Sequence, residues 1–192
     1  HFMQIAVTGG LGFIGSHTTV ELQQAGYEVV IVDNCSNASE SVLDGIERIT
    51  GTRPLFEKFD LREREKVSQF FTKYLNLRGI IHFAASKAVG ESVEEPLLYY
   101  ENNLATLVYL LQGLTEKEQA HFIFSSSCTV YGQAETMPIT EDAPVQPAES
   151  PYGNTKQIGE EIIRDTCKVR PGLQAISLRY FNPIGAHPSA EI

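Results

Sequence analysis

The sequence is poor in cysteine and in basic residues, and each shortage excludes a class of protein. Its three cysteines, Cys35, Cys128 and Cys167, lie far apart and form no Cys-x-x-Cys pair, so neither a disulfide framework nor a zinc site is expected. Fifteen basic residues stand against 24 acidic ones without a basic block, for a net charge of −9. A nucleic acid or an anionic membrane surface is therefore not an expected partner.

Long apolar runs are also missing. No run approaches the roughly 20 residues of a membrane span, and no secretory leader pattern opens the chain. We therefore expect no membrane partner and a cytoplasmic location. The 192 residues are 42% hydrophobic, enough for one core, so residues 1–192 are interpreted as one domain. His1 and Phe2 precede Met3 and are interpreted as a cloning remnant.

What the chain does contain is a regular alternation of two kinds of segment. Apolar strands are expected at 4–8, 28–33, 54–60, 79–85, 121–127 and 174–181. Segments with the 3.6-residue period of a helix lie at 16–25, 41–49, 62–75 and 96–114. The alternation predicts an α/β fold of the Rossmann type, a doubly wound parallel sheet with helices on both faces and strand order 3-2-1-4-5-6.

The expected helix at 96–114 is apolar on nearly every side. Its main stripe is Leu97, Leu104, Leu107, Leu111 and Leu114. Such a helix must be buried on two sides, and only one side can face its own sheet. This predicts a homodimer through the 96–114 helix and the helix that follows Pro151. The longest irregular segment is expected at 132–150.

A glycine-rich turn follows the first expected strand. It can be described as Gly10-x-Gly12-x-x-Gly15 or as Gly9-x-x-Gly12-x-x-Gly15. Glycine at this spacing permits a tight turn and lets backbone N–H groups approach a dinucleotide pyrophosphate. Asp33 ends the second strand about 20 residues later, where a carboxylate can accept hydrogen bonds from an adenosine ribose. The carboxylate favours NAD, since no arginine in 34–38 could receive a 2′-phosphate.

A tyrosine and a lysine share one face of a second expected helix. Ser150 is the expected N-cap and Pro151 the first helical residue. Tyr152 and Lys156 then lie at i and i+4, and none of the other seven tyrosines has a lysine at that spacing. A nearby ammonium and an oxidised nicotinamide would both favour the phenolate. A surface helix contact is the alternative interpretation of the pair.

A run of three serines supplies a further hydroxyl. Ser127 is the last of them and follows an apolar strand, which places it at the carboxyl edge of the sheet, where ligands bind in such folds. A loop without function is the alternative.

With these motifs in place, the sequence resembles the extended short-chain dehydrogenase/reductases, and among them the UDP-glucose 4-epimerase family. The resemblance extends along the whole chain. The matching stretches are 8–17, 33–34, 60–61, 83–92, 99–103, 125–132, 152–156 and 179–188. The runs at 87–92 and 179–187 are the ones specific to the epimerases.

The resemblance implies roles for individual residues. Ser127, Tyr152 and Lys156 would be catalytic, and Lys87, Ser127, Tyr152 and Asn182 would meet the substrate. The residues expected to bind NAD are Gly9, Gly12, Phe13, Ile14, Gly15, Asp33, Asn34, Asn37, Asp60, Leu61, Phe83, Ala84, Lys87, Asn102, Ser125, Tyr152, Lys156, Tyr180 and Phe181. On composition alone, Phe83 and Phe181 could equally be core aromatics, Lys87 a solvated loop residue and Asp60 a turn residue. No metal site is expected.

The implied activity is the interconversion of UDP-glucose and UDP-galactose in galactose metabolism. It proceeds by inversion at C4 through a transient 4-keto sugar and enzyme-bound NADH. Family members continue with a substrate-binding segment beyond the length of this chain, so we expect NAD binding but little activity from these residues alone. Ala85-Ser86 and Cys128 replace the family's usual glycine-leucine and alanine.

Two alternatives stay open. A nucleotide-sugar 4,6-dehydratase or decarboxylase typically carries Asp-Glu after the strand-end hydroxyl, where this chain has Cys128-Thr129. A non-catalytic NAD-binding module is the other.

Overall fold

The computed structural model describes residues 3–192, so the cloning remnant suggested at His1 and Phe2 lies outside the described residues. Its centre is a six-stranded sheet in which all neighbouring strands are parallel. The strands are β1 (Gln4–Thr8), β2 (Glu28–Asp33), β3 (Leu55–Lys58), β4 (Leu77–His82), β5 (Ala120–Ser125) and β6 (Leu173–Leu178). Their order is β3-β2-β1-β4-β5-β6. The predicted fold class and strand order are confirmed.

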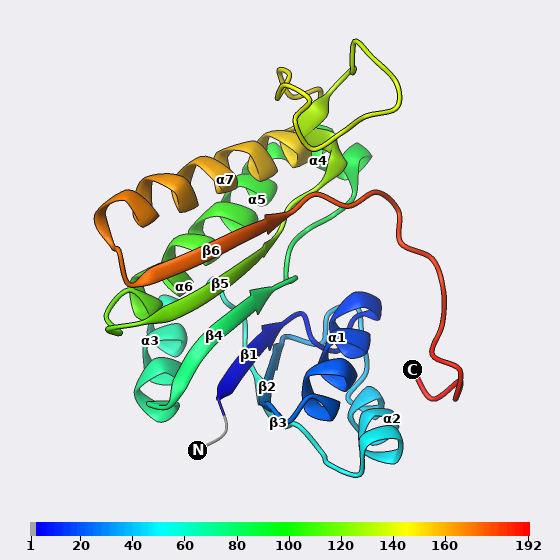
Figure 1. Ribbon diagram of the computed structural model, residues 1–192, viewed down its shortest axis with the longest axis vertical. Helices are drawn as coiled ribbons and strands as arrows, with labels where there is room; N and C mark the ends of the chain where they lie inside the picture. The colour runs from blue at the N-terminus through cyan, green and yellow to red at the C-terminus, as the bar shows by residue number, and fades with distance from the viewer. Residues whose placement is uncertain (1–2) are drawn as a thin grey trace.

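Helices cover both faces of this sheet (Figure 1). They are α1 (Phe13–Gln24), α2 (Ser41–Thr50), α3 (Arg64–Lys73), α4 (Val89–Glu94), α5 (Pro96–Tyr100), α6 (Thr106–Leu114) and α7 (Pro151–Val169). One apolar core joins the sheet to α3, α6 and α7 and includes Phe70, Leu107 and Phe122. A second core joins it to α1 and α2 and includes Val20 and Ile46. The sheet is thus sandwiched between two buried layers.

The later strands end sooner than the sequence predicts. Strand β4 ends at His82 rather than Ala85, β5 at Ser125 rather than Ser127, and β6 at Leu178 rather than Phe181. Strand β3 is also shorter than 54–60 at both ends. Phe83 and Ala84 continue the apolar pattern past β4 because they line a cavity above the sheet, whereas Phe181, past β6, is exposed.

The predicted helix at 96–114 is continuous but not uniform. Between α5 and α6 lies a π-helical turn, η1 (Glu101–Ala105). The helix packs against α3 and α7 of the same chain, so its own chain supplies part of the second cover that the sequence suggests for a partner. Leu97 was expected in the buried stripe but is 82% exposed, whereas Leu107 and Leu114 are fully buried.

Two irregular segments complete the chain. Residues 132–150 contain no helix or strand, as predicted, and project from the end of the molecule near α4. After β6 the chain crosses past α1 and ends beside α2 (Figure 1), where Arg48 and Glu191 form an ion pair of 2.6 Å. In residues 3–192 no helix is both long and apolar enough to cross a membrane.

Candidate functional site

The glycine turn connects β1 to α1 and leaves no room for side chains. A Cβ on Gly15 would lie 2.3 Å from the carbonyl oxygen of Gly9, and a Cβ on Gly9 would lie 2.9 Å from the amide nitrogen of Ala84. Gly9 also has a φ of +68°, a conformation that glycine adopts without strain. The turn therefore depends on glycine for both space and backbone geometry.

Helix α1 begins at this turn without a charged or polar side chain over its end. Its N-cap is Gly12, which makes no side-chain cap, and its first turn contains no acidic residue. The N-terminal N–H groups of a helix carry partial positive charge and favour an anion. Phe13, predicted to lie on a pyrophosphate, begins this helix and is 47% exposed, whereas Ile14 packs partly against the second core.

Asp33 stands at the carboxyl end of β2 and braces the turn. Its two carboxylate oxygens accept hydrogen bonds from the amides of Leu11 at 3.2 Å and Cys35 at 2.9 Å. Each oxygen keeps a further acceptor position, so the carboxylate can still receive ribose hydroxyls. The predicted role of Asp33 is compatible with this geometry.

A cavity of about 510 Å³ lies over the carboxyl ends of β1 to β4, a size usual for cofactor sites. It brings together eleven of the residues predicted to bind NAD. These are Gly9, Gly12, Asp33, Asn34, Asn37, Asp60, Leu61, Phe83, Ala84, Lys87 and Asn102. They come from segments far apart in sequence, which the parallel topology places at one edge.

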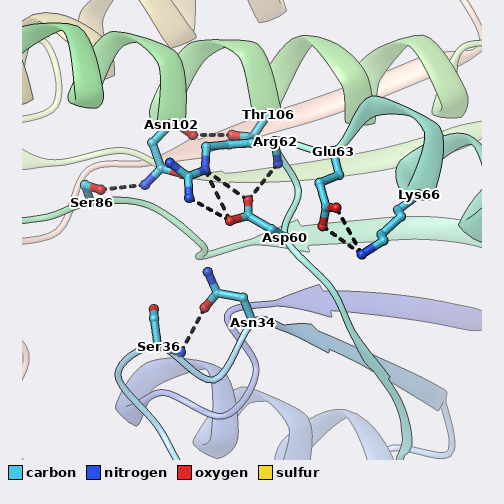
Figure 2. Close-up of polar contacts among 9 residues, drawn as sticks. All are labelled: Asn34, Ser36, Asp60, Arg62, Glu63, Lys66, Ser86, Asn102 and Thr106. Carbon is cyan, nitrogen blue, oxygen red and sulfur yellow. Dashed lines mark hydrogen bonds and ion pairs between the residues drawn. The ribbon is translucent and has the colours of Figure 1, made fainter.

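The adenosine end of the predicted site contains an ion pair that the sequence analysis missed. The guanidinium of Arg62 contacts the carboxylate of Asp60, at 2.8 Å in the shortest contact (Figure 2). Hydrogen bonding from Arg62 lowers the pKa of Asp60, and the side chain of Asn34 adds to this lowering. An arginine therefore does lie beside this pocket, but its guanidinium is paired with the carboxylate of Asp60.

The loop after β4 is fastened by two asparagines of the π-turn. The side chain of Asn102 donates to the hydroxyl of Ser86 (Figure 2). Asn103 accepts from the amide of Ser86 at 2.9 Å and donates to the hydroxyl of Thr155 at 3.1 Å. Asn103 is only 6% exposed, so the π-turn satisfies a buried amide while joining the cavity loop to α7.

The second part of the site is assembled around α7. Ser150 caps the helix as predicted, accepting from the amide of Gly153 at 3.1 Å, with Pro151 at its start. The Tyr152 phenol lies close enough to Ser127 for that hydroxyl to lower its pKa, so these two predicted residues do come together. Burial raises the pKa of Tyr152 despite the Ser127 contact, which lowers it. The phenol is therefore protonated at neutral pH in the free chain.

Lys156 is almost completely buried, with 4% exposure. Its Nζ donates to the carbonyl oxygen of Ser125 at 2.7 Å and lies 5.7 Å from the centroid of the Tyr152 ring. Burial, with a smaller effect from the charge of Lys87, lowers the pKa of Lys156 to about 7. The Tyr152–Lys156 spacing predicts an ammonium that lowers the pKa of the tyrosine, whereas in the structure the amine of Lys156 donates to the backbone.

The remaining predicted residues follow β6. The hydroxyls of Tyr180 and Ser125 are hydrogen-bonded to each other. Because the carbonyl of Ser125 also accepts from Lys156, both residues lie in the part of the site around Tyr152 and Lys156. Phe181 is 57% exposed, which excludes its interpretation as a core aromatic, and Asn182 is also exposed. Phe83, in contrast, is buried in the second core and also lines the cavity.

A buried histidine supports the base of the site. His82 ends β4, and its Nδ1 lies 2.6 Å from the hydroxyl of Thr8. Burial, with the charge of Lys156, lowers the pKa of His82 to about 3, so the ring is neutral and structural. Among residues 3–192 no group of three His, Cys, Asp or Glu side chains is arranged to hold a metal ion.

These features define a dinucleotide-binding α/β protein in which a serine, a tyrosine and a lysine lie together at the carboxyl edge of the sheet, outside the residues that line the cavity. The chain belongs to the NAD dependent epimerase/dehydratase family, which matches residues 5–191.

The named proteins that are similar to this chain include UDP-glucose 4-epimerases. UDP-glucose 4-epimerases from Haemophilus influenzae and Bacillus subtilis are 46% and 48% identical over 190 residues, covering 99% of this chain and 56% of each relative. The crystal structure of UDP-glucose 4-epimerase from Bifidobacterium longum in complex with NAD+ and UDP superposes with a TM-score of 0.94 at 42% identity. It covers 98% of this chain and 56% of the other. The chain thus spans about half the length of these relatives.

Proposed function

We propose that this chain is the NAD-binding part of a UDP-glucose 4-epimerase, acting in galactose metabolism. The observation that carries the proposal is the proximity of Tyr152 to Ser127 with Lys156 beside it on α7, in a chain that also has the cavity over β1 to β4. The epimerase relatives and the structure with NAD+ and UDP support it. Their greater length supports the expectation that these 192 residues bind NAD but turn over little sugar alone.

The residues present fit a dinucleotide. The glycine turn that a Cβ would fill and the uncapped end of α1 suit a pyrophosphate. Asp33 and Asn37 would hold the adenosine ribose, Asp60 and Leu61 would lie near the adenine, and Lys156 would hold the nicotinamide ribose. The other predicted residues, Phe13, Ile14, Asn34, Phe83, Ala84, Lys87, Asn102, Ser125, Tyr180 and Phe181, would complete the site.

Bound NAD would supply reversible removal of hydrogen from C4 of the sugar. Tyr152 would accept the proton of the 4-hydroxyl as a phenolate and later return it, while Ser127 hydrogen-bonds the same oxygen. Because burial raises the Tyr152 pKa in the free chain, added positive charge at the site is needed to form the phenolate. Asn182 and Lys87 would contact the UDP-sugar.

Association and location are part of the same proposal. The outer surface of α5 and α6, with α7 beside it, would form a homodimer interface, since Leu97 lies there almost fully exposed. The free cysteines and the absence of a basic block suit a cytoplasmic enzyme without a nucleic-acid or membrane partner.

The test combines cofactor identification with turnover. NAD released from the purified chain should be identified by mass spectrometry, and UDP-galactose turnover should appear in a chain extended to the length of its relatives. In the extended chain, Tyr152→Phe and Ser127→Ala should each lower kcat by about 10² to 10⁴, whereas Tyr27→Phe, at an exposed tyrosine, should not. Bound NAD without turnover in the extended chain would instead support a non-catalytic module.

A further inference from the structure

A buried carboxylate lies on the same face of α7 as the proposed catalytic residues. Tyr152, Lys156 and Glu160 follow one another at intervals of four, so they project from one side of the helix. Glu160 is 6% exposed, and no other Asp or Glu in residues 3–192 is buried. A carboxylate held away from water at this place requires an explanation.

The partner of this carboxylate is Arg179, the first residue after β6. Its Nε donates to Oε1 of Glu160 at 2.8 Å and its Nη2 donates to Oε2 at 2.9 Å. The guanidinium also lies 5.2 Å from the centroid of the Tyr131 ring, a side chain that is 3% exposed. Hydrogen bonding to Glu160, with a further contribution from Tyr131, raises the pKa of Arg179, so the arginine stays charged.

This cluster joins the three segments that carry the site. Glu160 belongs to α7 with Tyr152 and Lys156, and Tyr131 ends the 3₁₀ helix η2 (Cys128–Tyr131) that follows Ser127. Arg179 precedes the segment with Tyr180 and Asn182. A backbone hydrogen bond joins two of these segments directly, because the amide of Cys128 donates to the carbonyl of Tyr180 at 3.2 Å. We call this bond the Cys128–Tyr180 junction. The pair therefore fixes how these segments lie relative to one another.

Stability alone is a weak reason for such a pair. Removing two charges from water costs about as much as their attraction returns, so a buried pair often adds little net stability. What a two-bond arginine–carboxylate contact does supply is fixed geometry, because the planar guanidinium accepts only one relative orientation. Both oxygens of the buried Glu160 accept from Arg179, and neither residue lines the cavity over β1 to β4, so the pair is interpreted as part of the frame of the site.

We propose that Glu160 and Arg179 are positioning residues, which set the approach of Tyr152 to Ser127 and the course of the segment that carries Asn182. This inference rests on the proposed function, because the pair is proposed to position residues of that active site. The pair acts through Tyr131 and through the Cys128–Tyr180 junction.

Hydrogen exchange of the 192-residue chain tests this without cofactor or substrate. In the double variant Glu160→Met/Arg179→Met the charges disappear together, so neither is left buried alone. The amide of Cys128 should exchange at least 10-fold faster, whereas the amides of β1 should be unchanged. The matched control is Arg48→Met/Glu191→Met, which removes an exposed ion pair and should alter neither.

Unchanged exchange at Cys128 would overturn the inference, and so would equal acceleration at Cys128 and in β1, which would indicate a purely global contribution to stability. If the double variant does not fold, hydrogen exchange of Arg179→Lys tests the inference, because lysine keeps the positive charge but cannot form the two-bond contact with Glu160. Local acceleration at Cys128 supports positioning, and its absence overturns it.

Turnover supplies an independent check in a chain extended to the length of the relatives. There the double variant should lower kcat at least 10-fold while the amount of bound NAD stays the same. Unchanged kcat would overturn the positioning role. A parent chain that binds no NAD would overturn the proposed function, whereas the exchange measurement would still decide the role of the pair.

Discussion

At the scale of single residues, burial dominates the electrostatics of Tyr152 and Lys156. It raises the pKa of the phenol and lowers that of the amine to about 7, so both shifts favour the neutral forms. Burial thus makes the charged forms of both groups more costly in the free chain. In the proposed reaction, the phenolate of Tyr152 would have to be stabilised by charge that arrives with the ligands.

The low pKa of Lys156 predicts a pH dependence of folding stability. Its ordinary value is 10.5, so between about pH 7 and 10.5 the unfolded chain binds a proton that the folded chain lacks. The free energy of unfolding should therefore rise with pH in this window, by up to about 1.4 kcal/mol per pH unit from this group. Denaturant unfolding of the chain and of Lys156→Met should show the difference, with the rise smaller in the variant.

Lys168 provides the control, because its side chain is 68% exposed on the same helix. Lys168→Met should retain the pH dependence of the parent. Parallel curves for the parent and Lys156→Met would show that the buried amine stays charged in the folded chain.

Single residues also show what sequence can predict about the site. Local pattern alone predicts where Ser127, Tyr152 and Lys156 project, from a strand end and one helix face, while their proposed roles come from the family resemblance. Arg62 and Glu160 could not be predicted as part of the site, because each takes part through an ion pair that forms only in the folded chain. A carboxylate on a helix is usually solvated, and nothing in the sequence marks Glu160 as buried.

At the scale of elements, the strand ends and the π-turn are the features that the sequence described least well. Apolar periodicity predicts where side chains are buried, but it does not distinguish a paired strand from the loop that continues it into a site. The same limit applies to 96–114, where an apolar pattern predicts one regular helix. The π-turn carries Asn103, which bonds both Ser86 and Thr155, and such tertiary contacts leave no mark in an apolar period.

The tight packing of the turn between β1 and α1 predicts that a methyl group at Gly15 weakens NAD binding. Gly15→Ala places a Cβ at 2.3 Å from the carbonyl oxygen of Gly9, so the turn must open and α1 must move away from β1. NAD affinity measured by calorimetry should fall at least 10-fold, with a lower melting temperature. Gly90→Ala is the matched control, because nothing lies within 4 Å of a Cβ there. Equal affinities for both variants would mean that the turn does not hold the nucleotide.

At the scale of the whole molecule, two apolar surfaces compete as association sites. One is the proposed interface of α5 and α6, where Leu97 is 82% exposed, with Val89 and Val93 of neighbouring α4 49% and 61% exposed. The other is the edge strand β6, where Ile176 and Leu178 are 59% and 40% exposed. These two alternate with Leu173 and Ala175 of the core, so they lie on the sheet face opposite α7. An open strand edge is itself a place where chains pair.

The proposed dimer uses the helical surface, and lysine substitutions separate the two possibilities. Leu97→Lys and Ile176→Lys each add one charge at an exposed position, so neither should prevent folding. An ammonium buried in an interface has to lose its hydration. Sedimentation should therefore show the parent as a dimer, with the dissociation constant raised at least 10-fold by Leu97→Lys and unchanged by Ile176→Lys. The opposite result would place association at the strand edge, where unpaired backbone groups of β6 would join two sheets across copies of the chain.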